Sequence, residues 1–106
     1  MARALLHAPT IARRGDVFLL RALVAHPMDS GHRVDAMGRL LPRNIVRRME
    51  CHYDGERVFA ADLHAAIAAN PGISFYTVAT RSGAIRVRWW GDQGFEAETS
   101  VHIEVT

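Results

Sequence analysis

Apolar and polar residues alternate along most of this chain with a period of two, which is the period of a β-strand. The alternation is clearest over residues 44–53, 84–90 and 95–105. Turn residues separate these segments from further strand-like runs, which cover residues 2–8, 17–26, 56–61 and 73–80. The pattern predicts an all-β fold, an immunoglobulin-like antiparallel β-sandwich of about seven strands that occupies residues 1–106 as a single domain.

Local signals between the strands predict the connections. Asp54-Gly55 is the strongest hairpin signal, because both residues tolerate the positive φ of a type I′ turn. The alternation over residues 17–26 is imperfect, so we expect a bulge near Arg21. Residues 61–70 are rich in alanine and stop at Pro71, which favours a short helix or an irregular crossover. Residues 27–42 follow no period and are predicted to form the longest loop.

Composition and charge narrow the function classes. The chain of 106 residues is 49% hydrophobic, enough for one ordinary core, and no apolar run is long enough to span a bilayer. The net charge is +2 and all 13 basic side chains are arginines scattered along the sequence, which argues against nucleic-acid binding. Residues 1–8 are too short for a secretory signal, so we expect no export signal in the chain itself.

The single cysteine, Cys51, excludes an internal disulfide and is the natural candidate for a nucleophile. A nucleophile needs a base within hydrogen-bond reach, and the candidates are His52 and His26. Adjacent side chains of a strand point to opposite faces, so His52 is badly placed for this role. We interpret Cys51 as a buried structural residue and predict no catalytic residues.

His26, Met28 and His32 lie in one segment, a combination that could hold copper(I) or contribute to an iron site. The segment also resembles the His-Pro-Met stretch of superoxide reductases, which share an immunoglobulin-like fold. Those enzymes take a thiolate from a Cys-Asn-x-His-Gly motif near the carboxyl end, whereas no cysteine follows Cys51 here. We therefore expect no metal and no cofactor, and keep a small metal-binding or redox domain as the alternative function.

An ordered series of residues over nearly the whole chain resembles the SoxZ family. The series comprises His26-Pro27-Met28, Gly31, Asp35 to Gly38, Pro42 to Ile45, Cys51 to Gly55, Val58-Phe59, Ala66 to Pro71, Phe75, Ser82-Gly83, Trp89, Gly91 to Gly94, Ile103 and Val105. The resemblance implies a non-enzymatic subunit that pairs with SoxY, whose tail cysteine carries the intermediates of thiosulfate oxidation. It also implies transient contacts with other Sox enzymes, and a periplasmic location reached by co-export with a signal-bearing partner.

The loop of residues 27–42 has more apolar side chains than a solvated loop needs, and methionines suit an adaptable contact surface. Trp90 stands where the SoxZ family more often has a small or polar residue, and it is expected to pack across nearby arginines or to join a contact patch. The predicted partner-interface residues are Met28, Met37, Leu40, Leu41, Arg43 and Trp90. The last strand, 95–105, lacks proline and predicts an open sheet edge. We expect an obligate heterodimer with SoxY and a homodimer when the chain is alone.

Overall fold

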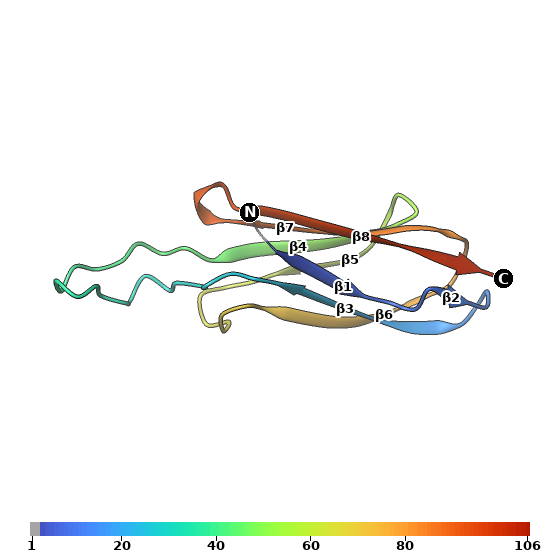
Figure 1. The fold of residues 1–106 in the computed structure, drawn as a ribbon, viewed down its shortest axis with the longest axis horizontal. Coiled ribbons are helices and arrows are strands. Elements are labelled where there is room, and N and C mark those ends of the chain that lie inside the picture. The colour runs from blue at the N-terminus through green and yellow to red at the C-terminus, as the bar shows by residue number, and fades with distance from the viewer. Residues whose placement is uncertain (1–2) are drawn as a thin grey trace.

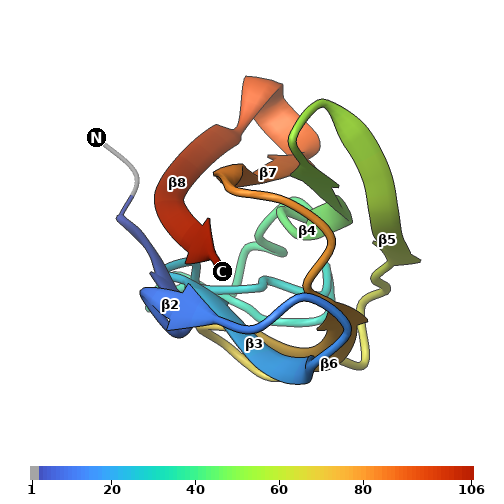
Figure 2. The same ribbon diagram turned by 90° about the vertical axis from the view of Figure 1, so that its right-hand side faces the viewer.

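Two β-sheets pack face to face in the computed structural model, which describes residues 3–106 (Figures 1 and 2). The smaller sheet has the strand order β1-β3-β6, and the larger has the order β2-β8-β7-β4-β5. The elements are β1 (Ala4–His7), β2 (Ile11–Ala12), β3 (Val17–Val24), β4 (Val46–Tyr53), β5 (Glu56–Asp62), β6 (Gly72–Val78), β7 (Gly83–Gly91), the 3-10 turn η1 (Asp92–Gly94) and β8 (Glu96–Val105). None of residues 3–106 belongs to a helix long and apolar enough to cross a membrane.

The predicted β-sandwich is confirmed, with eight strands instead of seven. The additional strand is β2, which has two residues and pairs in parallel with the end of β8, at Glu104 and Val105. A strand of two residues is too short to show a period in the sequence, which is why the pattern did not reveal it.

The inward side chains of the two sheets form one apolar core. Leu20, Met49, Ile85, Trp89 and Ile103 are all fully buried. Burying one side chain of this kind stabilises the fold by roughly 1.5–3 kcal/mol, so this layer holds the two sheets together.

Strand β3 buries every second side chain, and the side chains between them are exposed except for the partly buried Leu23. Its pairing with β1 and β6 is unbroken. The predicted bulge near Arg21 is therefore wrong. The register shifts lie in β4 instead, between Val46 and Arg48 and between Cys51 and His52. The irregular alternation of β3 has another cause: apolar residues also occupy its outward positions.

The predicted hairpin turn and crossover are both present. Asp54 and Gly55 join β4 to β5 with φ angles of 49° and 84°, the left-handed values that a type I′ turn requires. Residues 63–71 contain no α-helix and lead irregularly from β5 to β6, ending at Asn70 with a φ of 53° and at the buried Pro71.

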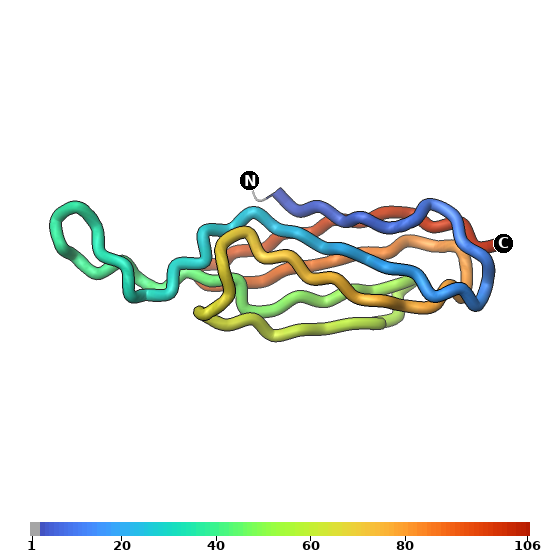
Figure 3. Tube along the Cα trace, turned by 90° about the horizontal axis from the view of Figure 1, so that it is seen from below, coloured from blue at the N-terminus to red at the C-terminus, as the bar shows by residue number. Residues whose placement is uncertain are grey.

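The segment between β3 and β4 extends from one end of the sandwich (Figures 1 and 3). We call residues 27–44 the arm. With the arm, the molecule measures 59 × 22 × 18 Å. The longest predicted loop is thus confirmed in position and gives the protein its elongated shape.

Candidate protein-interaction surface

The arm is held by backbone hydrogen bonds between its two sides. Near its base, Asp29 and Asn44 exchange two N–H···O bonds of 2.8 Å each. Further out, the Leu41 N–H donates to the Arg33 carbonyl at 2.8 Å. A loop without a sequence period thus forms a narrow ladder, because the pairing is carried by backbone groups.

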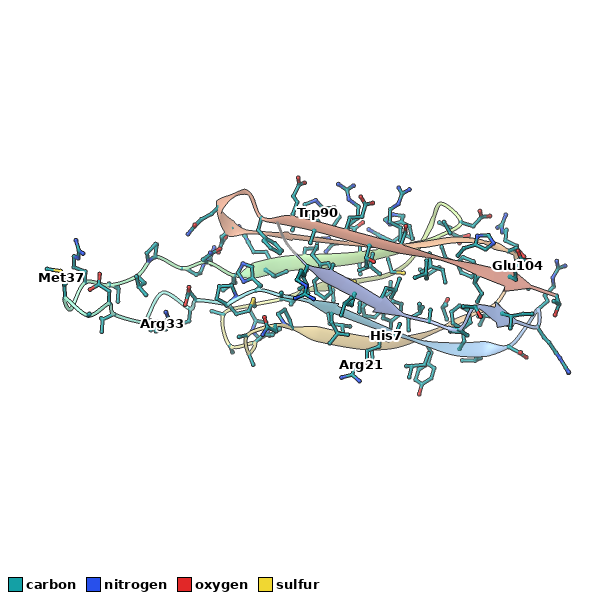
Figure 4. The ribbon with its side chains drawn as sticks, in the orientation of Figure 1. His7, Arg21, Arg33, Met37, Trp90 and Glu104 are labelled. Atoms are coloured by element: carbon teal, nitrogen blue, oxygen red, sulfur yellow. The ribbon has the colours of Figure 1, made fainter. Side chains whose placement is uncertain are left out.

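The tip of the arm is a turn built around Asp35. Its carboxylate accepts hydrogen bonds from the backbone N–H groups of Met37 at 2.8 Å and Arg39 at 3.0 Å. The Arg39 Nε adds a third bond at 3.2 Å. The backbone bonds from Arg39 and then Met37 lower the pKa of Asp35. Met37 is therefore presented at the far end of the arm by an ordered turn (Figure 4).

Three large apolar side chains are exposed near this tip. Val34, Met37 and Leu40 are between 59% and 77% exposed, and Val34 and Leu40 face each other across the arm. Leu41, a predicted interface residue, is partly buried. Met37, Leu40 and Leu41 are among the predicted interface residues, whereas Val34, which stands between Arg33 and Asp35, is not.

Arg43 anchors the arm to the turn between β7 and β8. Its guanidinium makes a bidentate pair with Asp92, with Nε···Oδ2 at 2.9 Å and a second bond at 3.0 Å to Oδ1. The same carboxylate accepts the Ile45 backbone N–H at 3.2 Å. Burial alone raises the pKa of Asp92, but the Ile45 and Arg43 bonds hold it below its usual value. Arg43 thus has a partner inside the chain.

Met28 departs from the expected interface. Its side chain is buried, and its sulfur accepts the Val46 backbone N–H at 3.1 Å. Its φ of 53° turns the chain inward at the base of the arm. Met28 therefore packs in the core beneath the arm and presents no surface to a partner.

His26 is the buried polar residue at the same point. Its Nδ1 accepts the Met28 N–H at 2.9 Å, and its ring lies edge-on to Phe95 with centroids 4.6 Å apart. Burial lowers the pKa of this imidazole. The lone pairs of His26 Nδ1 and the Met28 sulfur are thus used in backbone hydrogen bonds. Among residues 3–106, no three His, Cys, Asp or Glu side chains gather in a way that could hold a metal ion.

Cys51 lies on the core face of β4 and is fully buried, as the strand pattern predicted. Burial raises the pKa of its thiol to about 11. Since the thiolate is the reactive form, Cys51 has the environment of an inert structural residue.

Trp90 lies on the outer face of the five-stranded sheet and is partly buried. The Arg88 guanidinium stands 5.0 Å from the centroid of its ring, a cation–π contact that matches the expected packing across arginines. Ion pairs cover the same face, among them Arg86 with Glu98 at 3.1 Å. The charged side chains of this face thus pair with one another, and Trp90 is the indole among them.

The predicted open edge lies along β8. Its inner side pairs with β7 over Glu96 to Ile103, while β2 covers the outer side only at Glu104 and Val105. Within residues 3–106, no strand pairs in the sheet with the rest of this outer side, although β1 of the other sheet lies close to β8.

The outer face of the three-stranded sheet is unexpectedly apolar. Five of its outward side chains are between 44% and 69% exposed: Leu5, Val17, Leu19, Tyr76 and Val78. An antiparallel sheet with one solvated face usually places polar residues there. Figure 4 shows Arg21 pointing away from this sheet, on the opposite side of the sandwich from Trp90.

A sequence signal for this face was present. The run Val17–Val24 is apolar at both odd and even positions apart from Arg21, and a strand that is apolar on both faces is typical of one covered on both sides. The same irregularity also suggested a bulge, and for that reason the apolar outer face was not predicted.

Known proteins resemble this chain in two ways, through similar solved structures and through a family match. The solved structures it resembles include a superoxide reductase (neelaredoxin) from Ignicoccus hospitalis, with a TM-score of 0.74, 17% identity, and coverage of 97% of this chain and 80% of that one. The sulfur carrier protein SoxY from Chlorobium limicola f. thiosulfatophilum gives a TM-score of 0.65 at 15% identity, covering 97% and 78%. At these identities the likeness concerns the fold alone. No curated protein matches the sequence.

A family model described as "Sulphur oxidation protein SoxZ" matches residues 7–102. The match includes the arm, the Cys51 strand and the turn that carries Asp92. The resemblance drawn from the sequence is thereby confirmed, and the chain belongs to the SoxZ family.

Proposed function

We propose that the chain is the non-catalytic subunit of a SoxYZ-type sulfur carrier complex. It binds a SoxY-like chain and helps to present that partner's cysteine-bound sulfur intermediates to the enzymes of the pathway. The observation that carries the proposal is the SoxZ family match over residues 7–102. The buried Cys51, with its raised pKa, supports a division of labour in which the partner supplies the reactive thiol.

The arm is the first contact that we assign to this partner. Its exposed Met37 and Leu40 and the partly buried Leu41 form an apolar end on an ordered support. The unpaired length of β8 is a second place where a strand of another chain could add. An obligate interface of this kind buries roughly 2,000 Å² or more in total. The complex would reach the periplasm by co-export with a SoxY-like chain that bears the signal.

Co-expression with a SoxY-like chain from the same genome tests the proposal. The tagged chain should retain its partner through affinity and size-exclusion steps at equal stoichiometry. Replacing Met37 and Leu41 by Asp should weaken the pair. His32→Asp serves as the control, because it adds a carboxylate at an exposed position of the same arm and leaves the apolar side chains in place. Failure of the wild-type chains to co-purify contradicts the proposed function. Unchanged affinity of the double variant removes the arm from the interface.

Metal content and activity distinguish the proposed function from the alternative of a metal-binding or redox domain. We expect the purified chain to carry no stoichiometric metal and to be inactive toward thiosulfate by itself, with turnover only when the SoxY-like chain and the pathway enzymes are added. Elemental analysis after native purification checks the first point. Close to one copper or iron per chain would favour the alternative.

A further inference from the structure

We propose that the outer face of the β1-β3-β6 sheet is the main docking surface for the SoxY-like partner, which covers it with an apolar sheet face that carries a carboxylate opposite Arg21. The inference rests on the proposed function and assigns the partner to a surface that the arm does not include. Its basis is the apolar pattern of the face, its size and its charge.

The exposed apolar residues form neighbouring rows across the strands. Val17 pairs with Val78, and Leu19 pairs with Tyr76 in the next row. At the end nearest the arm, Leu5 pairs with Leu23. Cross-strand pairs on one face lie about 5 Å apart, so the two adjacent rows of Val17, Val78, Leu19 and Tyr76 make one apolar patch. The row of His7, Arg21 and Ser74 separates this patch from Leu5 and Leu23.

Size favours this face over the arm as the principal contact. A stable interface takes roughly 800 Å² from each partner, and an obligate one takes more. The three exposed apolar side chains at the arm tip, Val34, Met37 and Leu40, cannot supply that area. The sheet face adds five exposed apolar side chains, and the largest apolar patch on a soluble protein is often an interaction site.

The charge of Arg21 indicates which group the partner supplies at this face. Arg21 stands in the row between the two apolar ends, next to His7 in β1 and Ser74 in β6. No outward position of β1, β3 or β6 is Asp or Glu, and Arg21 forms no ion pair with any of residues 3–106. An arginine left without a counterion inside an apolar contact is costly, so a partner that covers it supplies a carboxylate.

The same charge argues against a second copy of this chain as the occupant. In a two-fold contact each subunit offers the same patch, and residues near the axis meet their own copies. Arg21 lies between the two apolar ends of the face, so a centred self-contact brings two guanidinium groups together in an apolar setting. A different chain avoids this repulsion.

The sheet architecture of the face agrees with a partner of similar fold. SoxY from Chlorobium limicola shares the sandwich architecture at a TM-score of 0.65. Two sheets pack face to face at about 10 Å with their strands within about 30° of each other, which requires two apolar faces. The three-stranded sheet offers one such face.

Substitutions that keep the strands intact test this surface. Leu19→Thr with Tyr76→Thr removes apolar contact while retaining β-propensity, and Ile11→Thr is the matched control at an exposed apolar site on β2. We expect the double variant to bind the SoxY-like chain roughly 30-fold more weakly or worse and the control to bind normally. Circular dichroism and thermal melting establish that each variant is folded before binding is measured.

A charge reversal tests the predicted carboxylate. Arg21→Glu should weaken binding by about tenfold or more, whereas Arg14→Glu, an exposed arginine outside the face, should not. Reversal of the facing Asp or Glu of the partner to Lys should restore the affinity of Arg21→Glu.

The outcomes separate this inference from the proposed function. If the wild-type chain binds SoxY and the Leu19→Thr/Tyr76→Thr variant binds equally well, the docking face is refuted while the function stands. If the wild-type chain does not bind SoxY at all, both fail. If the double variant abolishes self-association of the lone chain and leaves SoxY binding intact, the occupant is a second copy and the assignment to SoxY is overturned.

Discussion

Burial decides the chemistry of Cys51. The side chain faces the core between β5 and β7, and removal from water raises the pKa of the thiol to about 11. At neutral pH almost none of it is thiolate. Its role at the residue scale is therefore to fill space.

We predict that Cys51→Ala lowers the free energy of unfolding by about 1 kcal/mol, because it leaves a small void in a packed layer. Cys51→Ser should cost more, since it buries a hydroxyl group. Urea titration measures both, and sulfur transfer by the heterodimer should be unchanged. A Cys51→Ser complex that is as stable as the parent but no longer turned over would mean that the thiol is functional.

His26 predicts a pH dependence of stability. Its pKa in the folded protein lies below the ordinary value of 6.5 because burial disfavours the imidazolium. The unfolded chain therefore binds a proton more readily than the native one as the pH falls below 6.5. The contribution of His26 to stability is complete above that pH and is lost progressively toward the lower, folded-state pKa.

His26→Asn tests this dependence, because an amide oxygen can still accept the Met28 N–H. We expect a cost of about 1–2 kcal/mol at neutral pH from lost packing on Phe95, and a smaller fall in stability between pH 7.5 and 5.5 than in the wild type. His102→Asn, at an exposed position on β8, is the control. Equal slopes for the wild type and His26→Asn would contradict the assignment.

Single positions could be predicted where a strand period determined them. Cys51 follows the alternation of β4, so its core position was readable from the sequence. Met28 was not, because its burial depends on the distant Val46 and on a positive φ that is rare for methionine. Arg43 likewise has its partner 49 residues away, at Asp92.

At the scale of elements, the pair of Arg43 and Asp92 connects the arm to the η1 turn. The turn can approach because Gly91 has no side chain: a Cβ there would lie 2.5 Å from the Ile45 carbonyl oxygen. The orientation of the arm therefore depends on a contact made at its base.

We predict that Asp92→Asn loosens the arm and costs about 1–2 kcal/mol, because it weakens the bidentate pair and the bond from the Ile45 N–H. Hydrogen exchange at Asn44 and Ile45 should accelerate. Arg47→Ala is the matched control, since Arg47 lies 3.8 Å from the same carboxylate and is mostly exposed. Unchanged exchange in Asp92→Asn would show that the arm is held by its own ladder.

Elements with a strong period were predictable and elements set by pairing were not. The Asp54-Gly55 hairpin and the seven longer strands follow from local residue preferences. Strand β2 exists because Ile11 and Ala12 meet the end of β8. The arm ladder exists because backbone groups of its two sides pair, as at Asp29 with Asn44 and Val34 with Leu40. No pattern in the local sequence predicts either pairing.

At the scale of the whole molecule, the open side of β8 predicts self-association when the partner is missing. The strand is β-prone and lightly charged from Thr99 to Ile103, and β2 pairs only with its end. Sedimentation equilibrium of the lone chain should show a monomer–dimer equilibrium, which Ser100→Lys should shift toward monomer. A lone chain that stays monomeric at high concentration would remove this edge from consideration.

The architecture as a whole was predictable because strand count, turn spacing and family resemblance all pointed to the same sandwich. The outer face of the three-stranded sheet was not, although Val17 and Leu19 carried its signal. A strand covered by another chain has the same hydrophobic pattern as a core strand. The sequence alone therefore does not distinguish burial within the chain from burial by a partner.

The projecting arm also affects how the protein behaves in a sizing column. A compact chain of this length has a radius of gyration of about 13 Å, whereas this one has 16.1 Å. An elongated particle experiences more friction than a sphere of equal mass and elutes early. A monomer calibrated against globular standards will therefore be assigned too large a mass, and light scattering is the measurement that counts its subunits correctly.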